Sequence, residues 1–143
     1  MAEDLATRIV DRMFDNDPFS QWLGIERVED GAGVSVLRMT VRKEMLNGFS
    51  VAHGGITYSL ADSALAFASN AHGIQSVSIE TSISHTRKVA EGDILTATAK
   101  EISLTKRIGI YKIDITDQNN EIVALFKGTV YRTGKEWENR ITD

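Results

Sequence analysis

Residues 47–70 read N-G-F-S-V-A-H-G-G-I-T-Y-S-L-A-D-S-A-L-A-F-A-S-N, and this stretch decides the fold of the chain. It begins as a polar loop and becomes, from Gly54 or Gly55 onward, a run long enough for about four helical turns before Gly73 ends it. Apolar or small residues occur on every side of that run: Ile56, Leu60, Ala61, Ala64, Leu65, Ala66, Phe67 and Ala68. A helix that is apolar all round is a buried helix, so we expect the rest of the chain to wrap around it.

One charged residue, Asp62, lies inside this apolar helix. An ionised carboxylate in a low-dielectric environment costs several kcal/mol unless something compensates it. A lone helical Asp is ordinarily explained by a place on a solvent-facing stripe. Here Ala61, Ser63 and Ala64 surround it with small side chains, as expected if another molecule approaches the helix closely at this level. We therefore interpret Asp62 as a functional carboxylate.

His53-Gly54-Gly55 stands where the helix begins. Two glycines in the first turn leave unpaired backbone N–H groups, and the positive end of the helix dipole, accessible to a ligand oxygen. Asp62 follows Gly55 by almost two turns, so both lie on one face but roughly 10 Å apart along the axis. One helix cannot bring both groups to the same atom. Two antiparallel copies related by a two-fold axis can, with Asp62 of one chain near Gly55 of the other.

The segment before the central helix predicts a short helix and two strands. Apolar residues at helical intervals indicate an amphipathic helix over residues 3–15, which ends near Pro18. Phe19, Trp22, Leu23 and Ile25 lead into a predicted strand that extends to about residue 29, and both aromatic side chains are expected in the core rather than in a substrate pocket. A turn over 30–33 leads to a strand over 34–41. In the loop that follows, Asn47-Gly48 favours a tight turn with positive φ.

Four further strands are predicted after the helix, over residues 75–87, 94–104, 107–116 and 122–132. The first of them alternates most cleanly, with Val77, Ile79 and Ile83 on a face that is expected to be buried. One long buried helix with two strands before it and four after it is an α+β pattern. We expect a single domain over 1–143, with a helical segment in 1–18, a polar tail over 134–143, and a curved antiparallel sheet of about five to six strands around the helix.

The composition argues against several classes of protein. With 16 basic and 20 acidic residues the net charge is −4, and without a dense basic run the chain does not fit a nucleic-acid partner. The absence of cysteine and the lack of a metal-type pair among the 3 histidines predict no metal site. No apolar run approaches the roughly 20 residues that span a bilayer, and the first residues lack a secretory signal. We therefore expect a cytoplasmic protein with no membrane partner.

The pattern N-G-x-x-x-x-H-G-G followed by x-x-x-x-L-A-D-S-A-x-A-x-A-x-N resembles the signature of hotdog-fold acyl-CoA thioesterases of the phenylacetic-acid-degradation type. The likeness covers roughly residues 20–132 and includes Leu23-Gly24-Ile25, the 87–93 segment and the strand over 124–128. The sequence departs from the family pattern at residues 85–88, His-Thr-Arg-Lys, where a more apolar segment ending in Arg-Pro is usual. The resemblance implies the hotdog fold and a homodimer or a dimer of dimers.

The same resemblance implies hydrolysis of (hydroxy)phenylacetyl-CoA, or of a related aryl or medium-chain acyl-CoA, to the free acid and CoA. The Gly55 N–H is the candidate donor to the carbonyl oxygen, and Asp62 of the partner chain acts either as nucleophile or as general base on water. Asn47 is implied to position water or the thioester, His53 to orient the loop or substrate, and Ser63 to hydrogen-bond near the carboxylate. The ordinary alternatives are a helix-start residue bonded to backbone for His53 and a small packing residue for Ser63.

Coenzyme A carries phosphates, so cations are expected at the mouth of its cleft. The candidate substrate-binding residues are Gly54, Tyr58, Arg87, Lys88, Lys106 and Arg107, although the four basic residues also fit solvated turns. No cofactor is expected, because coenzyme A is part of the substrate. The alternatives are a non-catalytic acyl-CoA-binding module and, less favoured, a hotdog hydratase or dehydratase, since those enzymes commonly use a catalytic His with an acid.

Overall fold

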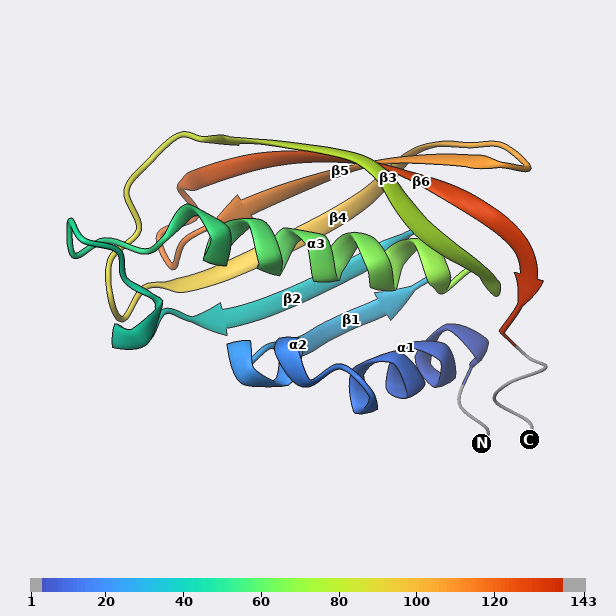
Figure 1. Cartoon of the computed structure of the whole chain (residues 1–143), viewed down its shortest axis with the longest axis horizontal. Helices are drawn as coiled ribbons and strands as arrows, with labels where there is room; N and C mark the ends of the chain where they lie inside the picture. Colours follow the sequence, from blue (N-terminus) through green and yellow to red (C-terminus); the bar gives the residue numbers. More distant parts are fainter. Residues whose placement is uncertain (1–3, 138–143) are drawn as a thin grey trace.

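The computed structural model describes residues 4–137, and its centre is the helix α3 (Gly54–Asn70), held against a curved antiparallel sheet (Figure 1). The strands are β1 (Glu26–Gly31), β2 (Val34–Thr40), β3 (Ile74–His85), β4 (Ile94–Leu104), β5 (Ile108–Thr116) and β6 (Ile122–Glu136). They form one six-stranded sheet in the order β1-β2-β4-β5-β6-β3. The predicted α+β arrangement of a long central helix wrapped by an antiparallel sheet is confirmed.

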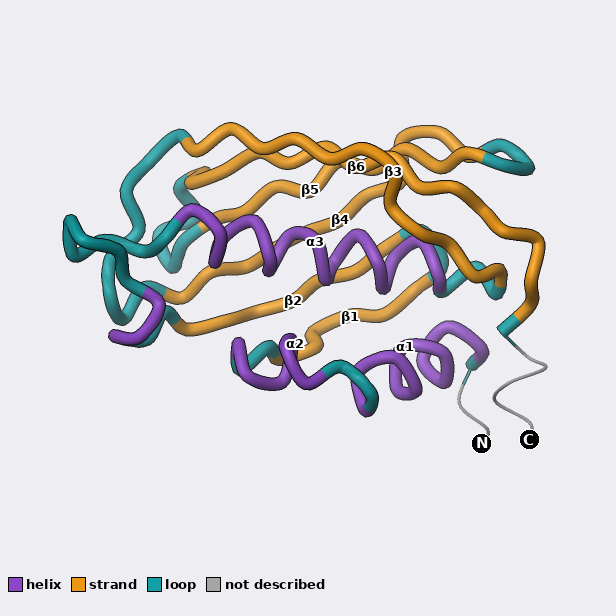
Figure 2. Tube along the Cα trace, viewed as in Figure 1, coloured by secondary structure: helices purple, strands orange, loops and turns teal. Residues whose placement is uncertain are grey.

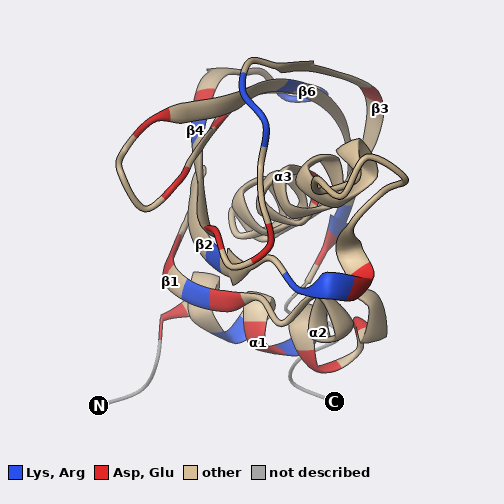
Figure 3. Cartoon of the chain, turned by 90° about the vertical axis from the view of Figure 1, so that its left-hand side faces the viewer, with Lys and Arg blue, Asp and Glu red and all other residues tan. Residues whose placement is uncertain are grey.

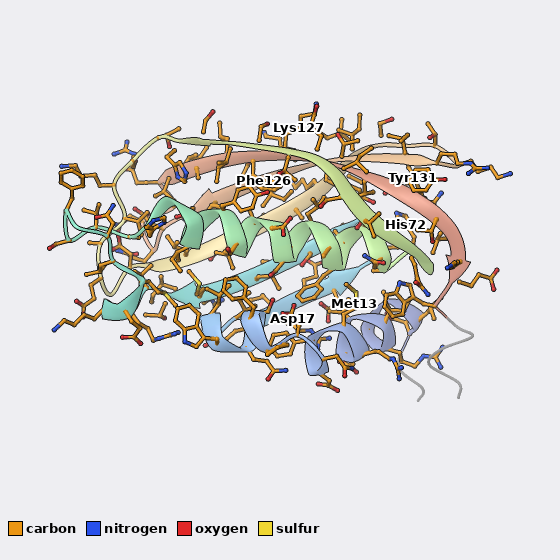
Figure 4. All side chains as sticks on the ribbon, in the orientation of Figure 1. Met13, Asp17, His72, Phe126, Lys127 and Tyr131 are labelled. Carbon is orange, nitrogen blue, oxygen red and sulfur yellow. The ribbon has the colours of Figure 1, made fainter. Side chains whose placement is uncertain are left out.

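The core lies between α3 and the concave face of the sheet. Leu60, Leu65 and Phe67 of the helix are almost wholly buried, and they belong to one core cluster that also contains small residues such as Ala97 on β4. Gly128 on β6 allows the closest approach, because a Cβ atom there would lie 2.5 Å from Cδ2 of Leu65. The sheet can therefore curl tightly around the helix, with side chains such as Phe126 directed toward it and Lys127 directed away from it (Figure 4).

Two helices precede the sheet, α1 (Leu5–Asp15) and α2 (Pro18–Leu23), and both lie along one side of α3 (Figure 2). The amphipathic helix α1 agrees with the prediction, and the predicted strand is present as β1, but the residues from Phe19 that were expected to lead into it form the helix α2, which was not predicted. Asp17 caps α2 by accepting a 2.9 Å hydrogen bond from the backbone N–H of Ser20, and Pro18 occupies the first turn. Phe19 and Trp22 are 51% and 48% exposed, so the expectation that they belong to the core was also wrong.

The strand β3 is an edge strand, which pairs only with β6. The prediction that one of its faces is buried was wrong, because Val77 and Ile79 are 54% and 57% exposed. An alternation of apolar and polar residues indicates that one face of a strand will be covered, but it does not indicate whether the same chain or another molecule covers that face. The described chain therefore presents an uncovered apolar edge next to α3.

The far end of the fold is held by Trp137. Its backbone N–H donates to the carbonyl of Gly73 and its indole Nε1–H donates to Oδ1 of Asn70, both at 2.9 Å. Strand β6 thus continues to Glu136, beyond the start of the polar tail predicted from residue 134. Residues 138–143 of that tail, and residue 3 of the first predicted helix, lie outside the described residues. No helix within residues 4–137 combines the length and the apolar character needed to cross a membrane.

Candidate active site

One stripe of α3 is covered neither by the sheet nor by the N-terminal helices, and it runs between β3 and α2 (Figure 1). Its members are Gly55, Ser59, Asp62 and Ala66, spaced by 4, 7 and 11 residues from the first, so they share one helix face. None of them is fully buried. Apart from the carboxylate, this stripe offers only small side chains. A partner can therefore approach the helix backbone closely on either side of Asp62.

The carboxylate of Asp62 is partly buried and makes neither a hydrogen bond nor an ion pair with any residue in 4–137. Burial is the cause of its altered acidity: desolvation raises the pKa of Asp62 above the ordinary value of 3.8. A carboxylate that is partly stripped of water and has no hydrogen-bond donor is more basic and more nucleophilic than a solvated one. This is the electrostatic condition that general-base or nucleophilic chemistry requires.

At the start of α3 the structure differs from the expectation of free N–H groups. The Gly55 N–H already donates to Nδ1 of His53, at 3.0 Å, so His53 caps the helix through its side chain. The prediction that this N–H is unpaired was therefore wrong for the free chain. Because Nδ1 accepts a hydrogen, the neutral imidazole carries its proton on Nε2, and the exposed ring offers an N–H to the solvent side. His53 is thus a helix-start residue bonded to the backbone, which was the ordinary alternative, and its Nε2–H remains a free hydrogen-bond donor.

A pocket of about 390 Å³ opens beside the first turn of α3. It is lined by Val51, Ala52, Gly54, Thr57, His85, Thr86, Arg87, Lys88 and Val89. A Cβ atom on Gly54 would lie 3.2 Å from Nε2 of His85, so the glycine leaves room for that ring. Arg87 forms an exposed 2.6 Å ion pair with Glu121. Figure 3 faces this end of the molecule, where α3 begins, and shows the basic stretch of the loop after β3 crossing it.

Asn47 holds the loop that leads into α3. Its Oδ1 accepts hydrogen bonds from the N–H groups of Phe49, at 2.8 Å, and Val51, at 3.4 Å. The tight turn predicted from Asn47-Gly48 is present, but the positive φ of 61° falls on Ser50 and not on Gly48. The side-chain oxygen of Asn47 is therefore engaged, and its amide NH₂ is the part that remains for a substrate.

The two remaining candidates on α3, Tyr58 and Ser63, are partly buried and flank the open stripe on opposite sides. Oγ of Ser63 lies 2.8 Å from Oγ of Ser20 on α2. The Tyr58 hydroxyl lies 2.5 Å from Oγ1 of Thr81 on β3, and its ring makes an edge-to-face contact with Phe126. Tyr58 is thus a partly buried wall between the helix and β3, and Ser63 is a contact between α3 and the N-terminal helices.

Lys106 and Arg107 do not lie near the pocket at the start of α3. They occupy the hairpin between β4 and β5 and line a second pocket, of about 300 Å³, together with Arg132. Strand β4 runs away from the end where α3 begins, so this second pocket lies at the opposite end of the sheet (Figure 1). In a single chain the four basic candidates therefore form two separate groups.

Sequence reasoning missed three residues that shape these sites: His85 beside Gly54, Arg132 in the second pocket, and Ser20 against Ser63. His85 ends the cleanest strand alternation, and its place at a strand terminus was the available signal. Ser20 had a local signal too, because Asp17-Pro18 is typical of a helix start and places a serine at the third helical position. Arg132 had none, since its pocket depends on pairing between distant strands.

Comparison with known proteins agrees with this geometry. Residues 49–124 match the sequence model of the thioesterase superfamily. A putative esterase of Archaeoglobus fulgidus is 39% identical over 93% of this chain and 86% of that protein. The acyl-coenzyme A thioesterase PaaI of Escherichia coli is 41% identical over 85% of this chain and 87% of that protein. The structure of E. coli PaaI, from the phenylacetic acid degradation operon, matches with a TM-score of 0.89 at 38% identity, covering 93% of this chain and 99% of that one. The resemblance read from the signature is confirmed, and the chain belongs to the thioesterase superfamily as a hotdog-fold thioester hydrolase.

Proposed function

We propose that this protein hydrolyses the thioester of (hydroxy)phenylacetyl-CoA, or of a related aryl or medium-chain acyl-CoA, and that Asp62 is its catalytic carboxylate. The observation that carries the proposal is the partly buried, unpaired carboxylate of Asp62 on an open stripe of α3, with a pKa raised by desolvation. The 41% identity to an acyl-coenzyme A thioesterase supports the substrate class. No cofactor takes part, since coenzyme A enters with the substrate.

The reaction needs a group that holds the carbonyl oxygen while it gains negative charge. The N-terminus of α3 supplies the helix dipole and the Gly55 N–H, and a well-placed donor of this kind contributes on the order of 3 kcal/mol to the transition state. In the free chain, Nδ1 of His53 accepts a hydrogen bond from the Gly55 N–H. The thioester carbonyl therefore displaces the imidazole from Gly55, and the freed ring, with the Asn47 amide, orients the substrate.

The site is completed by a second copy of the chain. Gly55 and Asp62 lie almost two turns apart on one helix, so a single chain cannot place both on one carbonyl group. The uncovered stripe of α3 and the exposed Val77 and Ile79 on the β3 edge are adjacent surfaces that an antiparallel copy would cover together. We therefore assign the catalytic unit to a homodimer, within a dimer or a dimer of dimers.

The same arrangement brings the two basic groups together. Antiparallel pairing places the β4–β5 hairpin of one chain, with Lys106 and Arg107, toward the end of the partner at which α3 begins. Arg87 and Lys88 line the pocket at that end. Phosphates of coenzyme A would then be held by cations from both chains.

The direct test is thiol release from a panel of aryl, short and long acyl-CoAs by the wild type and by Asp62→Asn. We expect hydrolysis by the wild type, and a loss of at least about 10³-fold in kcat in the folded variant, because the amide can neither attack nor remove a proton. A folded Asp62→Asn protein with wild-type turnover would reject the assignment of Asp62. Saturable binding of acyl-CoA without hydrolysis by the wild type would instead indicate a binding module.

The shared site has its own test in subunit mixing. Gly55→Pro removes the N–H while remaining compatible with the first helical turn. This variant and Asp62→Asn are each expected to be inactive, and random mixed dimers contain one site free of both changes. Recovery of about one quarter of wild-type activity after dissociation and reassociation is therefore expected. If the mixture stays inactive while both chains re-form dimers, the two groups do not belong to one site.

A further inference from the structure

A hydrogen-bond chain links the N-terminal helices to the residue that follows Asp62. Oδ1 of Asp17 accepts from the Ser20 N–H at 2.9 Å, and Oδ2 accepts from the Ser20 hydroxyl at 2.6 Å. Oγ of Ser20 lies 2.8 Å from Oγ of Ser63 on α3. Asp17 lies at the junction of α1 and α2, on the side of the molecule below α3 in Figure 4. This series of hydrogen bonds thus connects the cap of α2 to α3.

The direction of these hydrogen bonds follows from the number of hydrogens. An ionised carboxylate can only accept, so the single hydroxyl hydrogen of Ser20 is given to Asp17. The bond between the two serines must then use the hydrogen of Ser63. Ser20 is 1% exposed, so no solvent molecule can take over either bond. Ser63 is a partly exposed residue, and it therefore has no hydrogen left for the cleft, so its oxygen offers only lone pairs.

We propose that Asp17 and Ser20 are positioning residues that make Ser63 a pure hydrogen-bond acceptor beside Asp62, where it holds the attacking water. This inference rests on the proposed function. The water donates one hydrogen to Asp62 and the other to Ser63, which aims an oxygen lone pair at the thioester carbon. Water oxygen bonds to that carbon, its first hydrogen passes to Asp62, the C–S bond breaks, and the proton of Asp62 goes to the departing thiolate. The second hydrogen stays on the acid product.

This assignment also bears on the open choice between two roles of Asp62. A nucleophilic carboxylate attacks the carbon itself, and in that first step no water needs a second acceptor. An acceptor-only Ser63 next to Asp62 is useful when water is the nucleophile, because a water has two hydrogens to place. The hydrogen-bond chain therefore favours Asp62 as general base.

Asp17→Asn is the decisive variant, because it keeps the hydrogen bonds between residues 17, 20 and 63 but reverses their donor-to-acceptor direction. The Ser20 N–H is a donor, so the introduced asparagine side chain turns its amide oxygen toward that group and keeps the cap. Its NH₂ then donates to Oγ of Ser20, the hydroxyl of Ser20 donates to Ser63, and the hydrogen of Ser63 is turned toward the cleft. We expect kcat for acyl-CoA hydrolysis to fall about tenfold, the effect of one hydrogen bond, with KM nearly unchanged.

The pH profile separates this role from a packing role. Desolvation is the cause of the raised pKa of Asp62, which forms no ion pair with any residue in 4–137. In Asp17→Asn, a hydrogen bond from Ser63 stabilises the charged carboxylate, and the acid limb of kcat/KM moves to lower pH. Adding Ser63→Ala should abolish that movement. A purely structural contact would lower the melting temperature and leave the acid limb in place.

Two further variants complete the test. If Asp17→Asn does not fold, Ser20→Ala takes its place, because loss of the Ser20 hydroxyl also frees the hydrogen of Ser63. Adding Ser63→Ala to Ser20→Ala should then cost no additional activity. The matched control is Ser69→Ala, a buried serine on the same helix whose hydroxyl contacts only the carbonyl of Ala66, at 3.3 Å, and which should keep wild-type kcat. Wild-type kcat and pH profile in both Asp17→Asn and Ser20→Ala would overturn this inference alone. A wild type that hydrolyses no acyl-CoA would overturn the proposed function with it.

Discussion

Gly128→Ala is expected to lift α3, the helix that carries Asp62, away from the sheet. A methyl group at this position of β6 would lie 2.5 Å from Cδ2 and 2.9 Å from Cδ1 of Leu65, whereas ordinary contacts are 3.4–4 Å. About 1 Å of movement is therefore needed. Neither side yields readily, because Leu65 is 1% exposed and β6 is fixed between β5 and β3.

The loss of folding stability caused by Gly128→Ala can be estimated from the usual cost of overpacking. Overpacking of a well-packed core costs about 1–3 kcal/mol, and two contacts this short in a rigid setting belong at about 3 kcal/mol. For a domain of this size that corresponds to a fall of roughly 6–12 °C in melting temperature. Asp62 lies one helical turn before Leu65. A displacement of this size at a catalytic group lowers kcat/KM by up to about 10²-fold.

Urea unfolding of Gly128→Ala, Leu65→Ala and the double variant measures the contact itself. Leu65→Ala alone is expected to cost about 2–5 kcal/mol through its cavity, and the double variant should cost clearly less than the sum, with a coupling of about 2 kcal/mol. Gly31→Ala is the matched control, since a Cβ there meets only Val34 at an ordinary 3.8 Å. Wild-type stability in Gly128→Ala, or strictly additive losses in the pair, would refute the reasoning.

Four further outcomes are expected from the same structure. Because desolvation raises the pKa of Asp62, its charged form destabilises the fold as the pH rises through the raised pKa, so Asp62→Asn should melt at a higher temperature than the wild type at pH 8 and lose that advantage in acid. By the same shift, kcat/KM of the wild type should fall with a midpoint above 3.8, and a midpoint at or below that value would contradict it. His53→Ala removes the cap of α3 and should cost about 1 kcal/mol of stability, but less than tenfold in kcat, because the Gly55 N–H is then open; a loss equal to that of Asp62→Asn would make His53 a chemical group. Val77→Lys on the β3 edge should convert the proposed dimer to an inactive monomer in light scattering, and an active monomer would exclude a shared site.

The central helix and the strands after it could be predicted because their patterns are local. The apolar run of α3 and the alternation of β4 to β6 state which face is buried without reference to neighbours. The helix α2 was missed because aromatic residues outweighed the shorter signal of Asp17-Pro18 and Gly24, whose φ of 74° ends the helix. The order of the strands is not local, and it is what places Arg132 in one pocket with Lys106.

The candidate site divides in the same way. Asp62 could be singled out because a charge in an apolar helix needs an explanation, and the two glycines before it mark a helix start. The capping bond from Gly55 to His53 could not be read from the sequence, since a histidine before Gly-Gly fits a free or a bonded ring equally well. The bond between Ser20 and Ser63 joins residues 43 positions apart and depends on how α2 packs.

Three features of the single chain point to the same missing surface. The stripe around Asp62 is open, the β3 edge exposes Val77 and Ile79, and the helix start lies almost two turns from the carboxylate that we propose acts with it. An apolar edge exposed to water is unfavourable, and a partly buried carboxylate in an open stripe keeps part of its solvation. A second copy that covers both would bury the edge and desolvate Asp62 further. Association and activation of the carboxylate would then be one event, so the pKa of Asp62 should be higher in the assembled protein than in the free chain.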